Sequence, residues 1–494
     1  MKLAELGLSL RDIDLGGFDA ESDYKLAEDF VATQFVEAAI EGRRTLFLGR
    51  KGSGKSALFT QLPRLLREGE RATSVVPVTP DQYAWSALKQ YQEQGILPEQ
   101  AHTNAWKLTL AIEVAAALVK LDRPWSDEAG QSVQTLKGFI ESNYGENLKA
   151  GLLSTATSVV KGLRSLNLSA FGFGLGFDRD GEHDQPMTPA VIAALIETLD
   201  APLREQPVVI ELDRLDDSWD GSAESQTLLI GLLKAAKELN DRFMAPGPEE
   251  PRLRVLVFLR SDIYDGLRFD DKDKHRPTEE HIVWSVDGLR EMLSRRLPGE
   301  AEADDIFEDS EMRGRITPFN YIVKRTFLRP REVLQFVQEC LGRADADATV
   351  ASKDEIRAAE DRYSRWKVDD LKQEFRKVHP DFEELLEGLR QEVHRYDAIE
   401  DLQELLRAKA PAAVDKLGAR RAVELLFDAS VIGIRLRGAG QTRFKADDLD
   451  LSLPATGTVY VHQSLYKGLN IVEARASDGQ DQTEEDEAVR DATE

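Results

Sequence analysis

The sequence holds a single cysteine, Cys340, among its 494 residues. One thiol can form neither an internal disulfide nor a cysteine-based zinc cluster. Cys340 falls in the apolar helical pattern REVLQFVQECL, which is typical of a buried structural thiol. The seven histidines are scattered, without an H-x-x-x-H or H-x-x-E-H grouping, so we expect no dedicated transition-metal site.

Long apolar runs are also missing. No uninterrupted stretch reaches the length of about 18 residues that a membrane-spanning helix needs, so no membrane partner is expected. The first residues, MKLAELGLSLRDIDLGG, carry acids and lack the basic-then-apolar layout of a signal peptide. The sequence therefore predicts a cytoplasmic protein.

Positive charge is scarce, with 64 Lys and Arg against 89 Asp and Glu and a net charge of −25. This excess of acid repels phosphate backbones and disfavours a nucleic-acid partner. Part of it lies in residues 476–494, which hold eight acids and one arginine without any apolar pattern. Such a composition predicts an acidic disordered tail.

One motif stands out against these absences: residues 44–56 read RTLFLGRKGSGKS, a short apolar strand running into a glycine-rich turn. The turn fits the phosphate-binding pattern G-x-x-x-x-G-K-[ST], with helix-forming residues after it. Glycines let backbone N–H groups turn inward around a phosphate, and the helix N-terminus adds further donors. Lys55 would reach the β and γ phosphates, and the Ser56 hydroxyl would ligate Mg²⁺. The residues expected to bind nucleotide are Gly49, Arg50, Lys51, Gly52, Ser53, Gly54, Lys55, Ser56 and Ala57.

Hydrolysis needs an acidic strand end, which VVIELDRLDDSWD supplies. Asp213 follows a buried strand, where ligands bind in open α/β sheets, and could hold Mg²⁺ through water. Asp216 or Asp217 could orient or deprotonate the attacking water. The plainer interpretation of these last two acids is a solvated turn.

Two arginines are further candidates. Arg260 ends the strand pattern RLRVLVFLRS, where it could report the γ-phosphate or simply cap the strand. Arg331 opens a helix after Pro330, a residue suited to a first helical turn, and could project from a lid toward the nucleotide. The alternative for Arg331 is a solvated basic helix start.

Strand patterns separated by helical ones predict an α/β fold with a parallel sheet covered on both faces. The last of these strands is expected at HIVWS, residues 281–285. An alternating FGFGLGF segment predicts a β-hairpin or an extended arm within residues 151–182. The expected domains are a P-loop NTPase core at 1–285 with an insertion at about 84–200, a helical lid at 286–345, a helical linker at 346–408, a winged-helix-like α+β module at 409–475 and the tail at 476–494.

With these residues placed, the chain resembles the P-loop ATPases that include KAP, NACHT and other STAND proteins, with AAA+ enzymes as cousins. GRKGSGKS fits their Walker A element, and DRLDD at 213–217 fits their motif D-x-hydrophobic-D-[DE]. Asp217 replaces the more usual glutamate there, and Arg214 replaces a small residue. Arg260 resembles sensor 1, and RPR at 329–331 resembles the sensor 2 region.

The segments FLRSDIYDGLRF, IVWSVDGLREMLSRRL and TFLRPREVLQF are similar, more closely still, to a widespread bacterial P-loop ATPase family. The resemblance spans about residues 20–470. It implies an ASCE-type parallel sheet of order 5-1-4-3-2, a helical lid, and ATP with Mg²⁺ as ligands. Members of the wider group often act in signalling or antiviral defence.

Three functions remain open. The first is an ATPase switch that turns over slowly and is stimulated by self-assembly or by an effector protein, since no second catalytic constellation is readable. The second is a DNA-handling AAA+-like ATPase, supported by the winged-helix pattern and by basic residues such as Arg443 and Lys445. The third is a scaffold that holds nucleotide without significant turnover.

Overall fold

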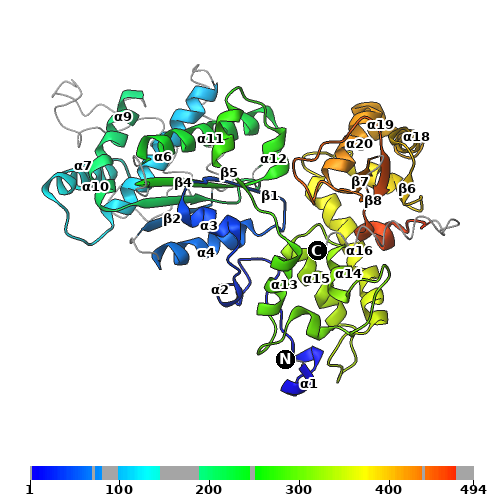
Figure 1. Cartoon of the computed structure of the whole chain (residues 1–494). Helices are drawn as coiled ribbons and strands as arrows, with labels where there is room; N and C mark the ends of the chain where they lie inside the picture. Colours follow the sequence, from blue (N-terminus) through cyan, green and yellow to red (C-terminus); the bar gives the residue numbers. More distant parts are fainter. Residues whose placement is uncertain are drawn as a thin grey trace. The chain divides into compact units, whose positions relative to one another are not determined.

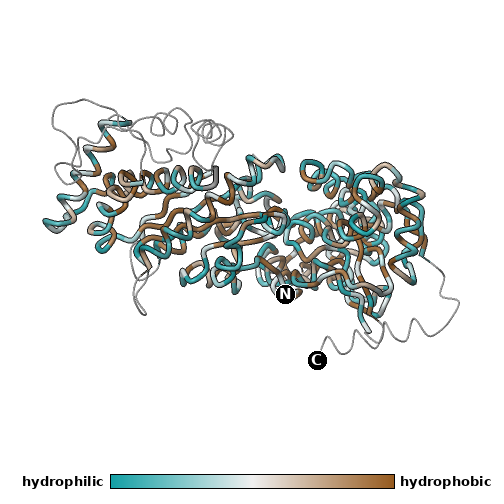
Figure 2. The backbone as a smooth tube through the Cα atoms, turned by 90° about the horizontal axis from the view of Figure 1, so that it is seen from above, coloured by the Kyte–Doolittle hydropathy of each residue, from teal (hydrophilic) through white to brown (hydrophobic). Residues whose placement is uncertain are grey.

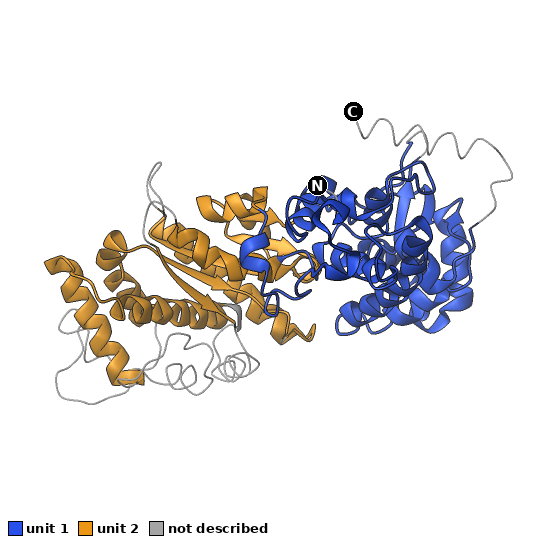
Figure 3. Ribbon diagram, turned by 90° about the horizontal axis from the view of Figure 1, so that it is seen from below, with its two compact units in different colours: residues 1–31, 51–54, 283–494 blue, residues 32–50, 55–282 orange. Residues whose placement is uncertain are grey.

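The structure is a computed structural model that describes residues 3–68, 73–79, 98–144, 189–217, 219–244, 251–436 and 440–473. It forms two compact units (Figure 3): the first comprises Met1–Val31, Lys51–Gly54 and Val283–Glu494, and the second comprises Ala32–Arg50 and Lys55–Ile282. The arm predicted at 151–182 and the predicted acidic tail lie outside the described residues. Within the described part of the chain, no helix is both long and apolar enough to cross a membrane.

The second unit is built on a five-stranded sheet of order β2-β3-β4-β1-β5, in which every pair is parallel. Read from its other edge, this is the predicted order 5-1-4-3-2, so the predicted P-loop NTPase fold is confirmed. The strands are β1 (Leu46–Gly49), β2 (Ser74–Val78), β3 (Val208–Leu212), β4 (Leu253–Arg260) and β5 (Glu279–His281).

The three central strands, β3, β4 and β1, are held together by burial of their apolar side chains. Every residue of β1 and β3 is buried, and the tube through these strands is mainly hydrophobic (Figure 2). Gly49 pairs with Arg260 across β1 and β4, and Leu212 pairs with Val257 across β3 and β4. This register brings the carboxyl ends of β1, β3 and β4 to one edge of the sheet, where parallel sheets bind ligands.

Helices cover both faces of this sheet, as expected for parallel strands. Figure 1 shows α3 and α4 on one face and α6 and α11 on the other. Within its described residues, the helices of the second unit are α3 (Gln34–Glu41), α4 (Lys55–Arg67), α6 (Pro98–Val119), α7 (Asp127–Tyr144), α9 (Pro189–Thr198), α10 (Asp200–Glu205), α11 (Ala223–Phe243), α12 (Ser261–Gly266) and the 3₁₀ helix η5 (Lys272–Thr278).

The fifth strand lies earlier than the HIVWS pattern predicts, since β5 ends at His281. The residues after His281 have other roles: the Ser285 side chain accepts the Gly288 N–H and caps the next helix, α13. The Trp284 indole donates to the Ser53 carbonyl at 2.8 Å. The HIVWS segment is therefore divided: its first two residues belong to the second unit, and the residues from Val283 onward belong to the first unit.

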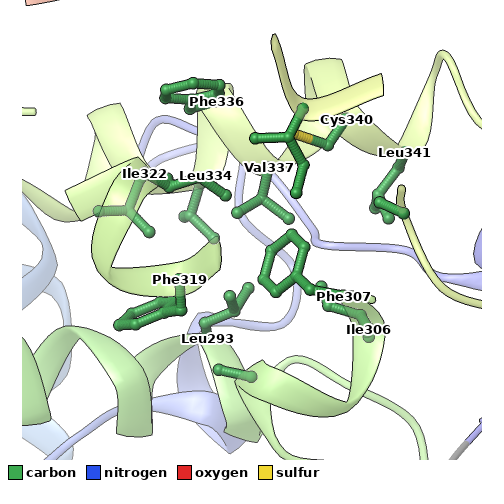
Figure 4. Close-up of a cluster of buried hydrophobic side chains, with 14 of the residues drawn as sticks. Leu293, Ile306, Phe307, Phe319, Ile322, Leu334, Phe336, Val337, Cys340 and Leu341 are labelled. Atoms are coloured by element: carbon green, nitrogen blue, oxygen red, sulfur yellow. The ribbon is translucent and has the colours of Figure 1, made fainter. Parts of the chain in front are cut away.

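In the first unit, helices pack around a hydrophobic cluster that includes Phe319, Phe336 and Cys340 (Figure 4). Cys340 is fully buried, as predicted, and burial raises the pKa of its thiol. The helices here are α1 (Leu3–Leu6), η1 (Leu10–Asp12), α2 (Leu26–Asp29), α13 (Val286–Arg295), η6 (Ala303–Ile306), α14 (Pro318–Val323), α15 (Pro330–Leu341) and α16 (Lys353–Phe375).

The N-terminal segment belongs to this same cluster, although the predicted NTPase core begins at residue 1. Leu3 and Leu10 are fully buried in it. Asp23 and Arg296 form a buried ion pair at 2.6 Å, and Arg296 also donates to the Leu15 carbonyl. An apolar residue every few positions in a short segment does not reveal which distant helices it will cover, so this assignment could not be predicted from the local pattern.

The C-terminal part of the first unit has the predicted winged-helix-like topology. Three helices, α18 to α20, lie between β6 and β7, and the antiparallel sheet has the order β6-β8-β7. The elements are α17 (Phe382–Gly388), β6 (Arg395–Tyr396), α18 (Ile399–Lys409), α19 (Pro411–Leu417), α20 (Ala419–Asp428), β7 (Ile432–Arg435), β8 (Thr458–Val461), η7 (Gln463–Leu465) and α21 (Tyr466–Leu469).

Two details of this module are not evident from its apolar pattern. ARRAVELLFDASVIGI could continue as one helix, but the helix ends at Asp428, because Ser430 adopts a left-handed conformation with φ of 60° and IGIR then enters the sheet as β7. The main partner of β7 is β8, and the segment TRFKA contributes only an isolated bridge from Arg443 to Ile434.

Candidate functional site

The phosphate-binding loop joins β1 to α4, as the motif predicts. Gly52 and Gly54 have φ values of +81° and +104°, a region that other residues adopt only with strain. These conformations turn the loop between Gly49, the last residue of β1, and Lys55, the first residue of α4. The result is a glycine-rich turn that runs directly into a helix N-terminus, an arrangement suited to an anion.

Lys55 is buried at the base of this loop. Its ammonium donates to the carbonyls of Gly49 at 2.9 Å and Arg50 at 3.1 Å. Burial lowers the pKa of Lys55, while the nearby carboxylates of Asp216 and Asp213 oppose that shift. The lysine is therefore a desolvated cation held among acids, which is an environment that favours a phosphate ligand.

Ser56 and Asp213 meet at the edge of the sheet, although they lie 157 positions apart in the sequence. The Ser56 hydroxyl donates to Asp213 Oδ2 at 2.8 Å. Burial raises the pKa of Asp213, and the hydrogen bond from Ser56 and the charge of Lys55 both lower it. A hydroxyl and a carboxylate are hard oxygen ligands of the kind Mg²⁺ binds, with its other positions left to water or phosphate. The residues present therefore fit a magnesium–nucleotide ligand.

The acidic loop after β3 separates its two remaining carboxylates. Arg214 has φ of 61°, and its Nε donates to Asp217 Oδ2 at 2.8 Å on an exposed part of the loop. Asp216 instead lies 3.8 Å from Arg260 Nη1 and is one of the carboxylates that act on Lys55. Arg214 and Asp217, the two residues that depart from the pattern D-x-hydrophobic-D-[DE] as noted above, thus pair with each other.

Arg260 lies at the end of β4, as predicted, within a compact charged cluster. Its guanidinium donates to Asp262 from Nε at 3.2 Å and from Nη2 at 2.7 Å. Arg50 Nη1 lies 3.8 Å from the same carboxylate. The cluster of Lys55, Arg50, Arg260, Asp213, Asp216 and Asp262 combines three cations with three acids.

The tip of the loop, Lys51–Gly54, belongs to the first unit and has its own partners there. Lys51 pairs with Asp370 of α16 at 2.8 Å, and its carbonyl accepts from Arg329 Nη1 at 3.1 Å. Arg329 is buried and also donates to Glu374 at 3.2 Å. The Ser53 carbonyl accepts the Trp284 indole N–H. Side chains from three separate segments therefore hold the tip of the loop.

Arg331, the predicted lid arginine, lies beside this tip. A Cβ built on Gly52 would be 3.4 Å from the Arg331 Cβ. The Arg331 guanidinium pairs with Asp19, and its Nε donates to the Phe18 carbonyl at 3.2 Å. Within the first unit, Arg329 rather than Arg331 contacts the loop backbone.

Sequence reasoning missed Asp262, Asp370, Arg329 and Trp284 as partners of the loop and its arginine. Local signals existed for Asp262, an acid two positions after the arginine at a strand end, and for Arg329, which begins the RPR segment that resembles sensor 2. Asp370 and Lys51 are 319 positions apart, and nothing in a helix of mixed charge marks which acid will pair with which lysine. The partly buried Trp284 indole donates its N–H to a backbone carbonyl, as indoles at such positions commonly do.

Comparison with known proteins gives three similarities. Residues 287–372 match the family described as FunZ-associated C-terminal helical domain. The "Putative transposon gamma-delta 80.3 kDa protein" of Escherichia coli strain K12 is 24% identical over 501 aligned residues, covering 94% of this chain and 68% of that protein. Among solved structures, Cdc6p from Pyrobaculum aerophilum aligns at 12% identity with a TM-score of 0.30, covering 92% of this chain and 94% of the other.

Proposed function

We propose that the chain binds ATP with Mg²⁺, hydrolyses it slowly, and uses nucleotide occupancy as a switch that controls assembly or an effector partner. The observation that carries this proposal is the hydrogen bond of 2.8 Å between Ser56 and Asp213 beside the buried ammonium of Lys55. A glycine turn with no ligand would need no buried lysine and no carboxylate at this place.

Each residue then has a defined task. The loop N–H groups and Lys55 bind the phosphates, while Ser56 and Asp213 hold Mg²⁺, directly or through water. Mg²⁺, when bound, neutralises charge on the phosphate oxygens and polarises them. Asp216 accepts a proton from the attacking water or orients it, since it faces the cationic cluster. Arg260 contacts the γ-phosphate.

The switch is supported by the helix α16, which contacts both the loop tip and the C-terminal module. Asp370 on this helix pairs with Lys51. Nearer its middle, the Ser364 hydroxyl donates to the Ser464 carbonyl at 2.6 Å and accepts the Gly468 N–H at 2.8 Å. A change at the loop tip would therefore act on a helix that is fixed to the C-terminal module within the same unit.

The test is ATP turnover by the wild type and Lys55→Ala, with mass photometry of both proteins in ATP and in ADP. We expect turnover and an ATP-dependent change in mass, each lost in Lys55→Ala. Turnover that persists in Lys55→Ala would contradict the assigned site. Nucleotide binding without turnover or a change in mass would favour the alternative of a nucleotide-holding scaffold.

For the biological role, we infer signalling or antiviral defence from the family resemblance. Cells carrying the wild type should resist phage infection better than cells carrying Lys55→Ala at equal protein level. Equal plaque numbers over a broad phage panel would count against defence and leave the ATPase proposal intact.

A DNA-handling ATPase is the second candidate, because the module of β6 to β8 has a winged-helix-like topology. Residues 409–473 hold nine Lys and Arg against seven Asp and Glu, so this module has a small positive formal charge although the whole chain is strongly acidic. The similarity to a protein whose title names a transposon is in keeping with it. Its side chains argue against it: Arg421 pairs with Glu424, Arg443 pairs with Asp448, and Lys445 donates to the Leu451 carbonyl.

Binding to a fluorescent duplex at low and at physiological salt decides between these candidates. The DNA candidate requires binding that weakens with salt and is lost in the double variant Arg443→Glu, Lys445→Glu. No binding at low salt would end it.

A further inference from the structure

Asp262 is a buried acid that the proposed mechanism does not use. It is the second residue of the short helix α12, two positions after Arg260, and its side chain is 11% exposed. Its two carboxylate oxygens accept from Nε and Nη2 of Arg260 at 3.2 and 2.7 Å. A two-point pair of this kind fixes the plane of the guanidinium as well as its position.

A second arginine shares the same carboxylate. Arg50 follows β1 directly, and the neighbouring register of Gly49 with Arg260 brings the ends of β1 and β4 together. Arg50 Nη1 lies 3.8 Å from Asp262 Oδ1. Although burial acts in the opposite direction, the charges of Arg260 and Arg50 lower the pKa of Asp262, so the carboxylate is ionised at neutral pH.

The other end of the Arg260 guanidinium faces the acidic loop. Its Nη1 lies 3.8 Å from Asp216, well beyond the distances to Asp262. Arg260 is therefore held along its Nε and Nη2 edge by Asp262, and its contact with Asp216 through Nη1 is the longer of the two. A phosphate that competes for this arginine would replace the longer contact with Asp216 first.

We propose that Asp262 is a positioning residue that fixes Arg260 at the end of β4, so that Arg260 presents Nη1 to a third phosphate and the site prefers ATP to ADP. The inference rests on the proposed ATP-binding function and adds to it the origin of this preference. Without the carboxylate, two neighbouring guanidiniums would repel each other and Arg260 could turn toward any phosphate in the loop.

The experiment measures the dissociation constants for ATP and ADP in Mg²⁺ by isothermal titration calorimetry, which needs no turnover. Asp262→Asn keeps the size of the side chain and removes its charge. We expect the ratio of the ADP and ATP dissociation constants to fall about tenfold, within the usual range for coupled sites. Asp265→Asn makes the same chemical change at an exposed position of α12 and should leave the ratio unchanged.

A double-variant cycle separates positioning from simple stabilisation. If Asp262 acts through Arg260, then Asp262→Asn should change the ratio little once Arg260→Gln is present. A merely structural role would lower thermal stability and the affinities for both nucleotides while leaving their ratio intact. Should Asp262→Asn fold poorly, Asp262→Glu keeps the charge but moves the carboxylate by one methylene group, and it too should lower the ratio.

A wild-type ratio in folded Asp262→Asn, or in folded Asp262→Glu if that variant is needed, would overturn the inference. So would an equal effect of Asp262→Asn with and without Arg260. Failure of the wild type itself to bind nucleotide, or binding unaffected by Lys55→Ala, would overturn the proposed function and with it this inference. The wild-type and Lys55 arms thus report on the site, and the Asp262 arms report on its preference.

Discussion

Asp216 and Asp217 lie next to each other in the loop after β3, and we expect the same substitution, Asp to Asn, to have different effects at the two positions. Asp216 lies 3.8 Å from Arg260 and acts on Lys55, so it faces the cluster where phosphate would bind. We expect Asp216→Asn to lower kcat by about 100-fold or more, because a positioned acid–base group contributes 10²- to 10⁴-fold. The dissociation constant for ATP should change far less, since the amide keeps the size of the side chain.

Asp217→Asn is the matched control, one position away and with the same loss of charge. Asp217 pairs with Arg214 at 2.8 Å, and both side chains are more than half exposed, at 52% and 53%. Exposed pairs of this kind contribute at most about 1 kcal/mol to stability. Even if all of that free energy appeared in the barrier, kcat would change only about fivefold.

The assay is phosphate release under single-turnover conditions, with the dissociation constant for ATP measured on the same preparations. Loss of turnover in Asp217→Asn with near-normal turnover in Asp216→Asn would refute the reasoning. It would mean that Asp217 acts in catalysis despite its pairing with Arg214. Equal turnover in both variants and the wild type would favour the scaffold alternative.

Three further perturbations test other parts of the structure. Ser56→Ala removes the hydroxyl that bonds Asp213, so calorimetry should show weaker ATP binding in Mg²⁺ and nearly unchanged binding in EDTA; equal weakening in both buffers would remove Ser56 from the metal site. Lys367→Met removes the cation that lies 2.6 Å from buried Glu332, so denaturant titration should show a free energy of unfolding lower by about 3 kcal/mol. The control Arg376→Met, at an exposed position, should have little effect. Burial lowers the pKa of His462 to about 3, so neutral His462 stabilises the fold above its unfolded pKa near 6.5, and this contribution should disappear as pH falls from about 6.5 to 3. His462→Asn should flatten the pH dependence of urea midpoints over that range, and an unchanged slope would contradict this interpretation.

Much of the fold was predictable because its signals are local. The glycine-rich turn, the buried strand before it and the apolar strand that ends at Asp213 each carry their own pattern. The rule that parallel strands present their carboxyl ends at one edge then brings Ser56 and Asp213 together, and the hydrogen bond between them is present. Sheet order also agreed, since the resemblance implied it and the observed order matches.

The remainder depends on tertiary choices that no local pattern records. Lys51 pairs with Asp370 rather than with another of the chain's 89 acids because α16 is fixed beside the loop tip by its own buried face. The turn at Ser430 is similar: a left-handed serine ends a helix that the apolar pattern would continue. Arg214 and Asp217 each depart from the motif D-x-hydrophobic-D-[DE] that the segment resembles, and only the structure shows that these two residues pair with each other.

Three pairings in the second unit provide a physical reason for the slow turnover that we propose. Lys55 donates to loop carbonyls, Arg260 is held along one edge by Asp262, and Asp217 is bound to Arg214 on the exposed side of its loop. Phosphate would have to replace the contacts of Lys55 and Arg260, and the Asp217 carboxylate is bound to Arg214 instead of facing the site. The charges that could stabilise a transition state are therefore partly paired with one another. A partner or a second copy that drew Lys55 away from the loop carbonyls would release a charge already within the cluster, without having to bring a new one. This is why we expect turnover to rise with assembly.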